Sequence, residues 1–453
     1  MNFAATQQLR RSPFGREAMA LGVWSALAVS ACGGRATDVE SESQISVGAA
    51  SVPLDESLPP RSIVDDDGKQ CPRAKFKTIQ AALDAAKSGD TILVCAGKYR
   101  EAPTVTNTVT LLGAQHGVDA RTRKGNSASE TLVITDGFDV AADKVVFDGF
   151  SLQAVFNESD DVAYGLFLHE EHSGYRVLNN LMSGSAGALF LGSSGAIPTS
   201  VMHNKFSGRG VFADSDEPRV HAHNERIQEN WFDGAQLGFG GPGHSDLQIL
   251  DNRLTNGATI TLFDNFYPTG NPATRDVTVQ GNSIDKPGNN PAILLRHIQS
   301  SELLDNTLED GSSSGIAIVG SNSDLYLGSN TISGFSGSAI QVGQPPPDGV
   351  AQEQTTGLSV DANHLDHNGA GIALLFAQSD AFSQNTIQHS RLIGIAVDAH
   401  SAHNTFEANT VSASKQRDCQ DQSVDGGTSH TANAWTRDIG GTSTPAGICI
   451  PQH

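Results

Sequence analysis

Residues 360–411 read VDANHLDHNGAGIALLFAQSDAFSQNTIQHSRLIGIAVDAHSAHNTFEANTV. Here an apolar residue, two spacers, an asparagine, one spacer and a second apolar residue occur three times, around Asn363, Asn385 and Asn409. The pattern occurs seven more times upstream, at Asn180, Asn204, Asn230, Asn252, Asn282, Asn306 and Asn330. Successive asparagines stand 22 to 33 residues apart, and most intervals are 22 to 26. A period of this length, repeated ten times, predicts a solenoid in which each repeat forms one coil.

A second signature lies between the asparagines: a glycine or alanine followed by alternating apolar residues, as in Gly315-Ile316-Ala317-Ile318. Alternation is the period of a β-strand, and the repeats show neither a 3.6-residue period nor the spacing of leucine-rich repeats. We therefore expect an all-β chain, a single-stranded parallel β-helix of about ten or more coils. Coils stacked about 4.8 Å apart would form a rod of roughly 50 Å.

The repeated asparagines are interpreted as structural. An asparagine that recurs at one turn can bond through its side-chain amide to the asparagine of the next coil. Asparagine also tolerates the left-handed backbone of a sharp corner. No catalytic role is assigned to them.

The composition limits the possible partners. The chain has 453 residues, 47 glycines, only 17% charged residues and a net charge of −21. Such an acidic surface argues against nucleic acid, because nucleic-acid binding depends on clustered Lys and Arg. A polyanionic glycan would need a local basic patch or a bound cation. We expect a monomer.

The N-terminus predicts export. Basic residues precede an apolar run from Ala18 to Val29, and Val29-Ser30-Ala31-Cys32 resembles the bacterial lipobox, in which the cysteine is lipidated. We expect a lipoprotein signal peptide over residues 1–32, a lipid on Cys32 as the only membrane contact, and a place on the outer membrane or cell surface. The alternatives are a secretory signal cut near Ala31 and twin-arginine export through Arg10-Arg11.

The rest of the chain divides into three parts. Residues 33–61 are rich in Ser, Glu, Asp and Pro and predict a flexible linker. Residues 62–413 predict the β-helix with an N-terminal cap, including one amphipathic helix from Phe76 to Lys87. Residues 414–453 predict a C-terminal cap.

Four cysteines remain once Cys32 is set aside, two near each end of the folded part. In an oxidising compartment they allow three pairings, of which we prefer Cys71 with Cys95 and Cys419 with Cys449, because each bond then closes one end. A zinc site is the competing interpretation, but no CxxC spacing is present.

Several stretches resemble the pectin-lyase-like superfamily: VDDDG from Val64, FKTIQAA from Phe76 and VCAGKYRE from Val94 match its N-terminal cap, and Trp435 with the later PAGIC resembles its end. With the asparagine repeats, the likeness covers most of residues 62–413. It implies a right-handed β-helix with three parallel sheets. It implies little about activity, because the superfamily mixes lyases, hydrolases, esterases, epimerases and adhesins, and the active-site motifs of polygalacturonases, pectin methylesterases and pectate lyases are absent.

Aligning the glycine-centred strands predicts one outward-facing column. It reads His169, Asp214, Gly238, Phe263, Arg296, Val319, Gly343, Leu375 and Asp398.

The polar part of this column is the candidate site. Arg296, Asp264 and Asp214 are the candidate catalytic residues, with Arg296 as the base. Their carboxylates could also bind a calcium ion. Gln236, Phe263, Tyr267 and His297 are the candidate substrate-binding residues, the aromatic ones for stacking on sugars. The alternative is an ordinary solvated face.

These features predict an envelope-anchored protein that binds or modifies a polysaccharide. If it is an enzyme, we expect a polysaccharide lyase or glycoside hydrolase. The alternative is a structural or adhesive lipoprotein without catalysis.

Overall fold

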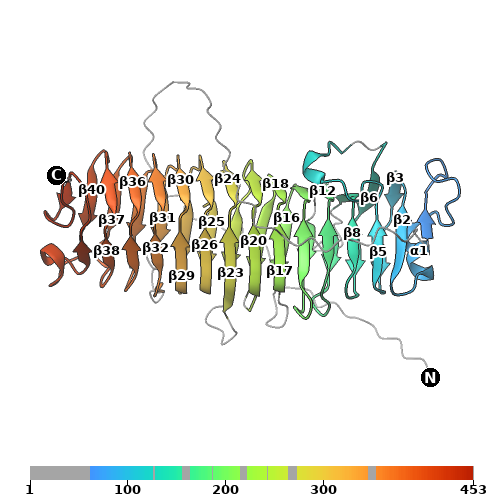
Figure 1. Ribbon diagram of the computed structural model, residues 1–453, viewed down its shortest axis with the longest axis horizontal. Helices are drawn as coiled ribbons and strands as arrows, with labels where there is room; N and C mark the ends of the chain where they lie inside the picture. The colour runs from blue at the N-terminus through green and yellow to red at the C-terminus, as the bar shows by residue number, and fades with distance from the viewer. Residues whose placement is uncertain are drawn as a thin grey trace. The chain divides into compact units, whose positions relative to one another are not determined.

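The computed structural model describes residues 62–125, 128–155, 164–185, 187–214, 222–241, 243–263, 273–344 and 353–451. The predicted signal peptide, the lipidation site Cys32 and the linker lie outside these residues. Within them the chain forms three parallel sheets with 15, 13 and 14 strands, and consecutive strands pass from one sheet to the next (Figure 1). This is the predicted parallel β-helix.

The first sheet contains β1 Ser62–Val64, β2 Asp90–Val94, β5 Val109–Leu112, β8 Val146–Asp148, β11 Arg176–Leu178, β14 Thr199–Met202, β17 His223–Gln228, β20 Ser245–Leu250, β23 Thr274–Gln280, β26 Ile298–Leu304, β29 Ser323–Gly328, β32 Ser359–Asp361, β35 Ala381–Ser383, β38 Thr405–Glu407 and β41 Ala434–Thr436.

The second sheet contains β3 Gly97–Arg100, β6 Thr131–Thr135, β9 Phe150–Ala154, β12 Leu181–Gly184, β15 Lys205–Ser207, β18 Trp231–Asp233, β21 Arg253–Thr255, β24 Ser283–Asp285, β27 Thr307–Glu309, β30 Thr331–Ser333, β33 His364–Asp366, β36 Thr386–Gln388 and β39 Thr410–Ser412.

The third sheet contains β4 Thr104–Val105, β7 Gly137–Val140, β10 Tyr164–Leu168, β13 Gly187–Leu191, β16 Gly210–Asp214, β19 Gln236–Gly240, β22 Ile260–Phe263, β25 Ile293–Arg296, β28 Ile316–Val319, β31 Ser338–Val342, β34 Ala370–Leu374, β37 Ile393–Val397, β40 Arg417–Asp421 and β42 Ser443–Thr444. The short 3-10 helices are Ala120–Thr122 and Thr428–His430.

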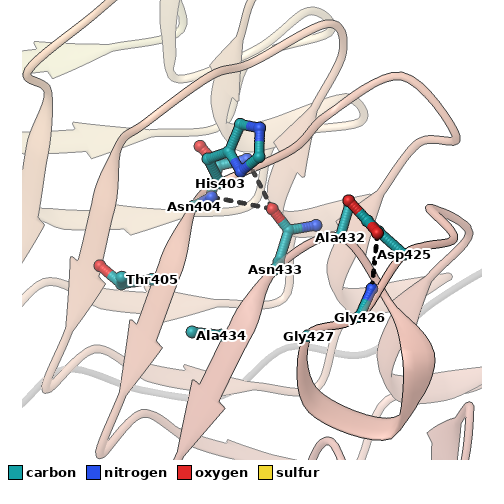
Figure 2. A pocket seen from close by; sticks show the side chains of 9 residues that line it. All are labelled: His403, Asn404, Thr405, Asp425, Gly426, Gly427, Ala432, Asn433 and Ala434. Carbon is teal, nitrogen blue, oxygen red and sulfur yellow. Dashed lines mark hydrogen bonds between the residues drawn. The ribbon is translucent and has the colours of Figure 1, made fainter.

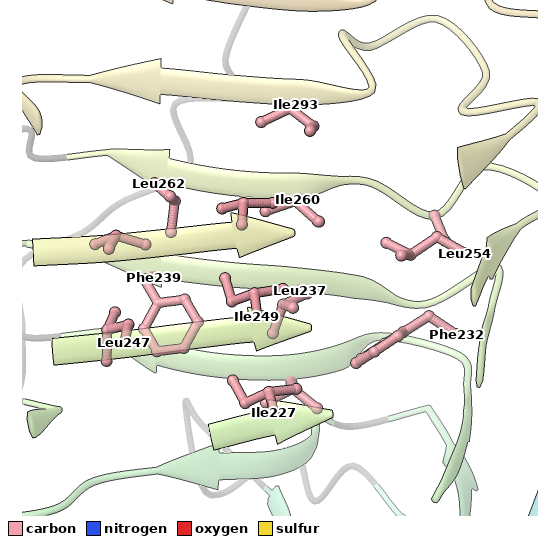
Figure 3. Packing of buried hydrophobic residues seen from close by; sticks show 14 of the residues in the cluster. Ile227, Phe232, Leu237, Phe239, Leu247, Ile249, Leu254, Ile260, Leu262 and Ile293 are labelled. Atoms are coloured by element: carbon pink, nitrogen blue, oxygen red, sulfur yellow. The ribbon is translucent and has the colours of Figure 1, made fainter. Parts of the chain in front are cut away.

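The core fills the inside of the coils. Along each strand, alternate residues point inward, and residues paired in register stack on their neighbours from coil to coil. Figure 3 shows this packing in the middle of the stack, where Phe232, Leu237, Phe239 and Leu262 are at most 1% exposed.

The asparagines form a continuous ladder between the first and second sheets. In its middle, the Asn282 side-chain Oδ1 accepts hydrogen bonds from the backbone N and the Nδ2 of Asn252, each at 3.0 Å. The Asn282 Nδ2 in turn donates to Asn306 Oδ1 at 3.0 Å. The same pattern runs from Asn180 to Asn409 and ends at Asp438, whose Oδ1 accepts from Asn409. The predicted structural role of these asparagines is confirmed.

Disulfides lie near both ends of the stack. Cys71 bonds to Cys95, and Cys419 bonds to Cys449, as the positions of the cysteines predict. At the first end, α1 (Ile79–Ala85) packs its buried residues against β1 and β2. The helix is shorter than predicted, because extended residues at Thr78 and Ala86 cap it.

At the second end, the sheets do not stop at residue 413. Strands β40, β41 and β42 continue the first and third sheets, and Trp435 of β41 stacks on Phe406 with ring centroids 3.9 Å apart. The stack therefore extends into the part predicted to be only a cap, because this segment keeps the alternating inward pattern.

Candidate functional site

The outward face of the third sheet carries most of the predicted site residues. Strand pairing gives the order of the central column directly: Asp214 pairs with Gly240, Gly240 with Phe263, and Phe263 with Arg296. Gly240 therefore takes the place predicted for Gly238, which lies two residues earlier in the strand and pairs with Thr261. The alignment was off by two residues there because both glycines fit the glycine-centred pattern.

The predicted catalytic residues are separated along this column. Asp214, which the structure describes by its backbone alone, and Arg296 are three coils apart, or about 14 Å at the usual spacing of parallel strands. Asp264 and Tyr267 lie outside the described residues. Direct contact between Asp214 and Arg296 would exceed the reach of their side chains.

Arg296 instead faces a carboxylate that sequence reasoning missed. Its Nη2 lies 3.8 Å from Oε2 of Glu353, and Nε2 of His297 lies 3.2 Å from the same oxygen. Glu353 follows β31 after a long connection, so no strand period could predict its position. His297 is 1% exposed and is therefore not presented to a ligand, in contrast to its predicted role in substrate binding.

Gln236 lies on the same outward face but at the start of its strand. Its Nε2 donates to Thr259 Oγ1 at 3.4 Å. Four residues of extended chain, about 13 Å, separate it from Gly240 in the column of Phe263 and Arg296. The structure thus brings Phe263 and Arg296 together and leaves Gln236 apart from them.

An aromatic row on this face was not predicted. It consists of Tyr164, Phe167, Phe190 and Phe212, on three successive strands. The rings of Phe167 and Phe190 stack with centroids 4.5 Å apart, and Tyr164 meets Phe190 edge-on at 5.1 Å. The next outward position after Phe212 is Gly238, where an added Cβ would lie 3.2 Å from the Phe212 ring. Sequence reasoning missed the row because Gly187-Ala188-Leu189-Phe190-Leu191 reads as continuously apolar.

An acidic and imidazole group borders the aromatic row. His169 packs edge-on against Phe167, with ring centroids 4.9 Å apart. Its Nε2 lies 2.6 Å from Asp139 Oδ1, and this hydrogen bond raises the pKa of His169 above its ordinary value against the effect of burial. The row therefore has a polar edge, formed by an imidazole paired with a carboxylate.

A shallow hollow lies near the C-terminal end of the stack, between His403–Thr405, Asp425–Gly427 and Ala432–Ala434 (Figure 2). Its amides are already engaged: Asn433 Oδ1 accepts from the backbone N and the Nδ2 of Asn404, at 2.9 and 3.0 Å. Asp425 accepts from the backbone N of Gly426 at 2.7 Å. These groups form a second ladder and a turn, so the hollow is explained by the fold.

Comparison with known proteins supports the handedness of the coil. Residues 291–418 match the family model described as a right handed beta helix region. No curated protein matches the chain. Among the described residues, no helix has the length and apolarity needed to cross a membrane.

Solved structures with similar coils include three carbohydrate-related proteins. The catalytic unit of the GH87 alpha-1,3-glucanase from Streptomyces thermodiastaticus has 14% identity, covers 85% of this chain and 70% of its own, and has a TM-score of 0.48. The mannuronan C-5 epimerase AlgE6 A-module from Azotobacter vinelandii has 13% identity, covers 81% of this chain and 92% of its own, and has a TM-score of 0.39. The periplasmic alginate epimerase AlgG has 11% identity, covers 73% of this chain and 72% of its own, and has a TM-score of 0.37. At these identities and scores no activity is transferred to this chain.

Proposed function

We propose that this right-handed parallel β-helix is an exported protein that binds a polysaccharide along the outward face of its third sheet. The observation that carries the proposal is the aromatic row of Tyr164, Phe167, Phe190 and Phe212. Outward positions of a β-helix lie outside the core and are normally polar, so a row of stacked rings there, with Phe190 at its centre 8% exposed and the flanking rings partly exposed, requires a reason.

Aromatic rings with a polar border have the properties that sugar recognition requires. A pyranose ring offers apolar C–H groups to an aromatic surface and hydroxyl groups to neighbouring polar side chains. His169 and Asp139 supply such polar groups at one edge of the row. Because the coils repeat along one axis, the same face can follow a linear polymer over several sugar units.

The central column is the finer part of the proposal. Phe263 and Arg296 are neighbours in register and would contact the same polymer farther along the face. Arg296 would then pair with an acidic sugar or, in an enzyme, act instead as the base of a lyase, with Asp214, Asp264, Gln236 and Tyr267 as further contacts.

Asp214 and Arg296 lie too far apart for one calcium ion to contact both side chains, and Asp264 lies outside the described residues. A calcium ion binds its oxygen ligands at 2.3–2.6 Å. The backbone of Asp214 lies about 14 Å from that of Arg296 along the stack, so an ion held by Asp214 would not contact a sugar held by Arg296. We therefore assign no step to a metal at Arg296.

Affinity electrophoresis in gels containing a neutral glucan or a polyuronate tests the binding proposal. Phe167→Ala should weaken the affinity measured from retardation about fivefold through the loss of an aromatic contact worth roughly 1 kcal/mol. The matched control is Trp231→Ala, because Trp231 faces outward on the second sheet, where Lys205 Nζ lies 3.7 Å from its ring centroid. Retardation by no glycan, or equal losses in both variants, would contradict the proposal.

Incubation of the purified protein with the same polyuronate distinguishes binding from turnover. If Arg296 acts as a base, incubation with a polyuronate should produce an unsaturated sugar with ultraviolet absorbance, and Arg296→Ala should abolish that product. Retardation without any product would instead favour the adhesive function.

The export part of the proposal rests on the lipobox-like segment ending at Cys32 and on the two disulfides, which persist in oxidising compartments. Labelled palmitate fed to cells should enter the wild-type protein and not Cys32→Ser. Label in both proteins, or in neither, would contradict lipid anchoring.

A further inference from the structure

Two histidines of neighbouring coils lie side by side on the surface. His367 and His389 directly follow β33 and β36, whose residues pair in register. Both have a left-handed backbone, with φ of 54° and 50°. Their rings stack with centroids 4.6 Å apart and an interplanar angle of 27°. The parallel coils therefore place two imidazoles at the same corner, one above the other.

A single carboxylate faces both imidazoles. Asp366 Oδ2 lies 2.8 Å from Nδ1 of His367, and its Oδ1 lies 2.8 Å from Nδ1 of His389. One potential ligand atom from each of the three side chains lies within 4.8 Å of the other two. This group differs from an acidic surface cluster because it offers two imidazole nitrogens and one carboxylate.

We propose that Asp366, His367 and His389 form a binding site for a divalent transition-metal ion, with zinc or nickel as the chemical class. Imidazole nitrogen favours these ions over calcium and magnesium, which prefer oxygen ligands throughout.

The three side chains are close enough for one ion to bind one atom of each after a local rearrangement, because those atoms lie within 4.8 Å of one another. Zinc binds imidazole nitrogen and carboxylate oxygen at 2.0–2.2 Å, which sets neighbouring ligand atoms roughly 3.3 Å apart. The two 2.8 Å contacts join the imidazoles to different oxygens of Asp366, so binding requires each ring to turn its Nδ1 away from the carboxylate and toward a common ion. His367 and His389 side chains are 62% and 51% exposed, so both can make that shift and water can complete the coordination.

The neighbouring coils leave this corner open. The equivalent position is Gly334 in the preceding coil and Ala413 in the following one, since each directly follows its strand of the second sheet. Neither residue has a side chain long enough to cover the imidazoles. A metal ion can therefore approach from solvent.

Isothermal titration of the full chain, without any added histidine tag, with zinc and separately with nickel tests the site. We expect His367→Ala and His389→Ala each to weaken binding at this site more than tenfold, and Asp366→Asn to weaken it about tenfold. His364→Ala is the matched control, because His364 is exposed on the same strand but does not belong to the group, and it should leave affinity unchanged.

Thermal unfolding gives a second measurement that does not depend on heat of binding. Zinc should raise the Tm of the wild-type protein and not that of the His367→Ala/His389→Ala double variant, because a bound ion links two coils of the native state only. Equal zinc affinity in the double variant would overturn the proposal. The absence of both binding heat and a Tm shift in the wild-type protein at millimolar zinc and nickel would overturn it as well.

Discussion

Glu225 is the residue whose surroundings differ most from what its sequence context suggests. It lies in β17 between polar neighbours, yet its side chain points into the coil, in register with Thr199 and Leu247. Neither of its carboxylate oxygens has a hydrogen-bond partner among the residues that the structure describes. Burial therefore raises its pKa well above the ordinary value for glutamate.

Replacing Glu225 with leucine, the residue that follows it in register, should stabilise the protein at neutral pH. A carboxyl whose folded pKa is raised contributes its full stability only below the unfolded pKa of about 4.3, and this stability is lost as pH rises toward the folded pKa. Glu225→Leu should raise the free energy of unfolding at pH 8 by about 1 to 3 kcal/mol and flatten its pH dependence.

Thermal unfolding at pH 5 and pH 8 provides the measurement. The control is Glu302→Leu, since Glu302 lies on the exposed face of β26 in the same sheet. A Glu225→Leu variant that unfolds at lower temperature than the wild-type protein at pH 8 would count against this interpretation.

Asp380 shows the same effect at a ladder position. Its Oδ1 accepts a hydrogen bond from the backbone N of Leu358 at 3.1 Å, and burial raises its pKa to about 7. The next two coils carry Asn404 and Asn433 at this position, where the amide donates as well as accepts. An aspartate can donate a hydrogen bond only when its carboxyl is protonated. We therefore expect Asp380 to reproduce the hydrogen bonding of an asparagine best below neutral pH.

At the scale of the elements, the asparagine ladder determines how the first sheet turns into the second. Asn282 is 1% exposed and joins three coils: its Oδ1 accepts from Asn252, and its Nδ2 donates to Asn306 and to the backbone oxygen of Ile249. Such a network is rigid when every member is satisfied, and the loss of one member leaves buried groups without partners.

Asn282→Ala should therefore lower the free energy of unfolding by about 2 to 3 kcal/mol, the cost of unpaired buried donors and acceptors. Equilibrium unfolding in guanidinium chloride gives the value. Asn289→Ala, at an exposed position between β24 and β25 of the same coil, should change it by less than about 0.5 kcal/mol. Similar losses in the two variants would show that the ladder does not carry this stability.

The elements also show what the sequence could and could not predict. Asn252, Asn282 and Asn306 revealed the coil because their period is fixed by the backbone, and Phe263 and Arg296 were brought together by the same register. Glu353 comes from an irregular connection, which has no period. The aromatic row could not be assigned to a face, because Phe190 stands within a run of apolar residues that fits the core equally well.

At the scale of the whole β-helix, the strands of each coil pair with those of the coils before and after it. Stability in such a stack is nearly a sum of coil and neighbour terms, so a local defect is felt locally. The two disulfides lie near the ends, where a coil has only one neighbour and frays most easily.

Removing the second disulfide by Cys419→Ser with Cys449→Ser should accelerate amide hydrogen exchange in β40, β41 and β42 and leave exchange in β17 to β25 unchanged. Mass spectrometry of peptic fragments resolves these regions. The reciprocal double variant, Cys71→Ser with Cys95→Ser, should affect only β1 to β3. A uniform increase over all coils would show that the stack unfolds as one cooperative unit.

The direction of the asparagine ladder has one more consequence. Every amide in it passes a hydrogen bond toward the C-terminus, and Asp438 closes the series because its carboxylate accepts from Asn409 without needing a successor. An interior asparagine carries no information about its position along the ladder, since Asn230, Asn282 and Asn385 each donate the same hydrogen bond to the next asparagine. The length of the protein is therefore set by its terminators alone, and duplication or deletion of a whole repeat leaves the remaining rungs intact. A gene encoding such a chain can change the length of the stack in single steps of one coil.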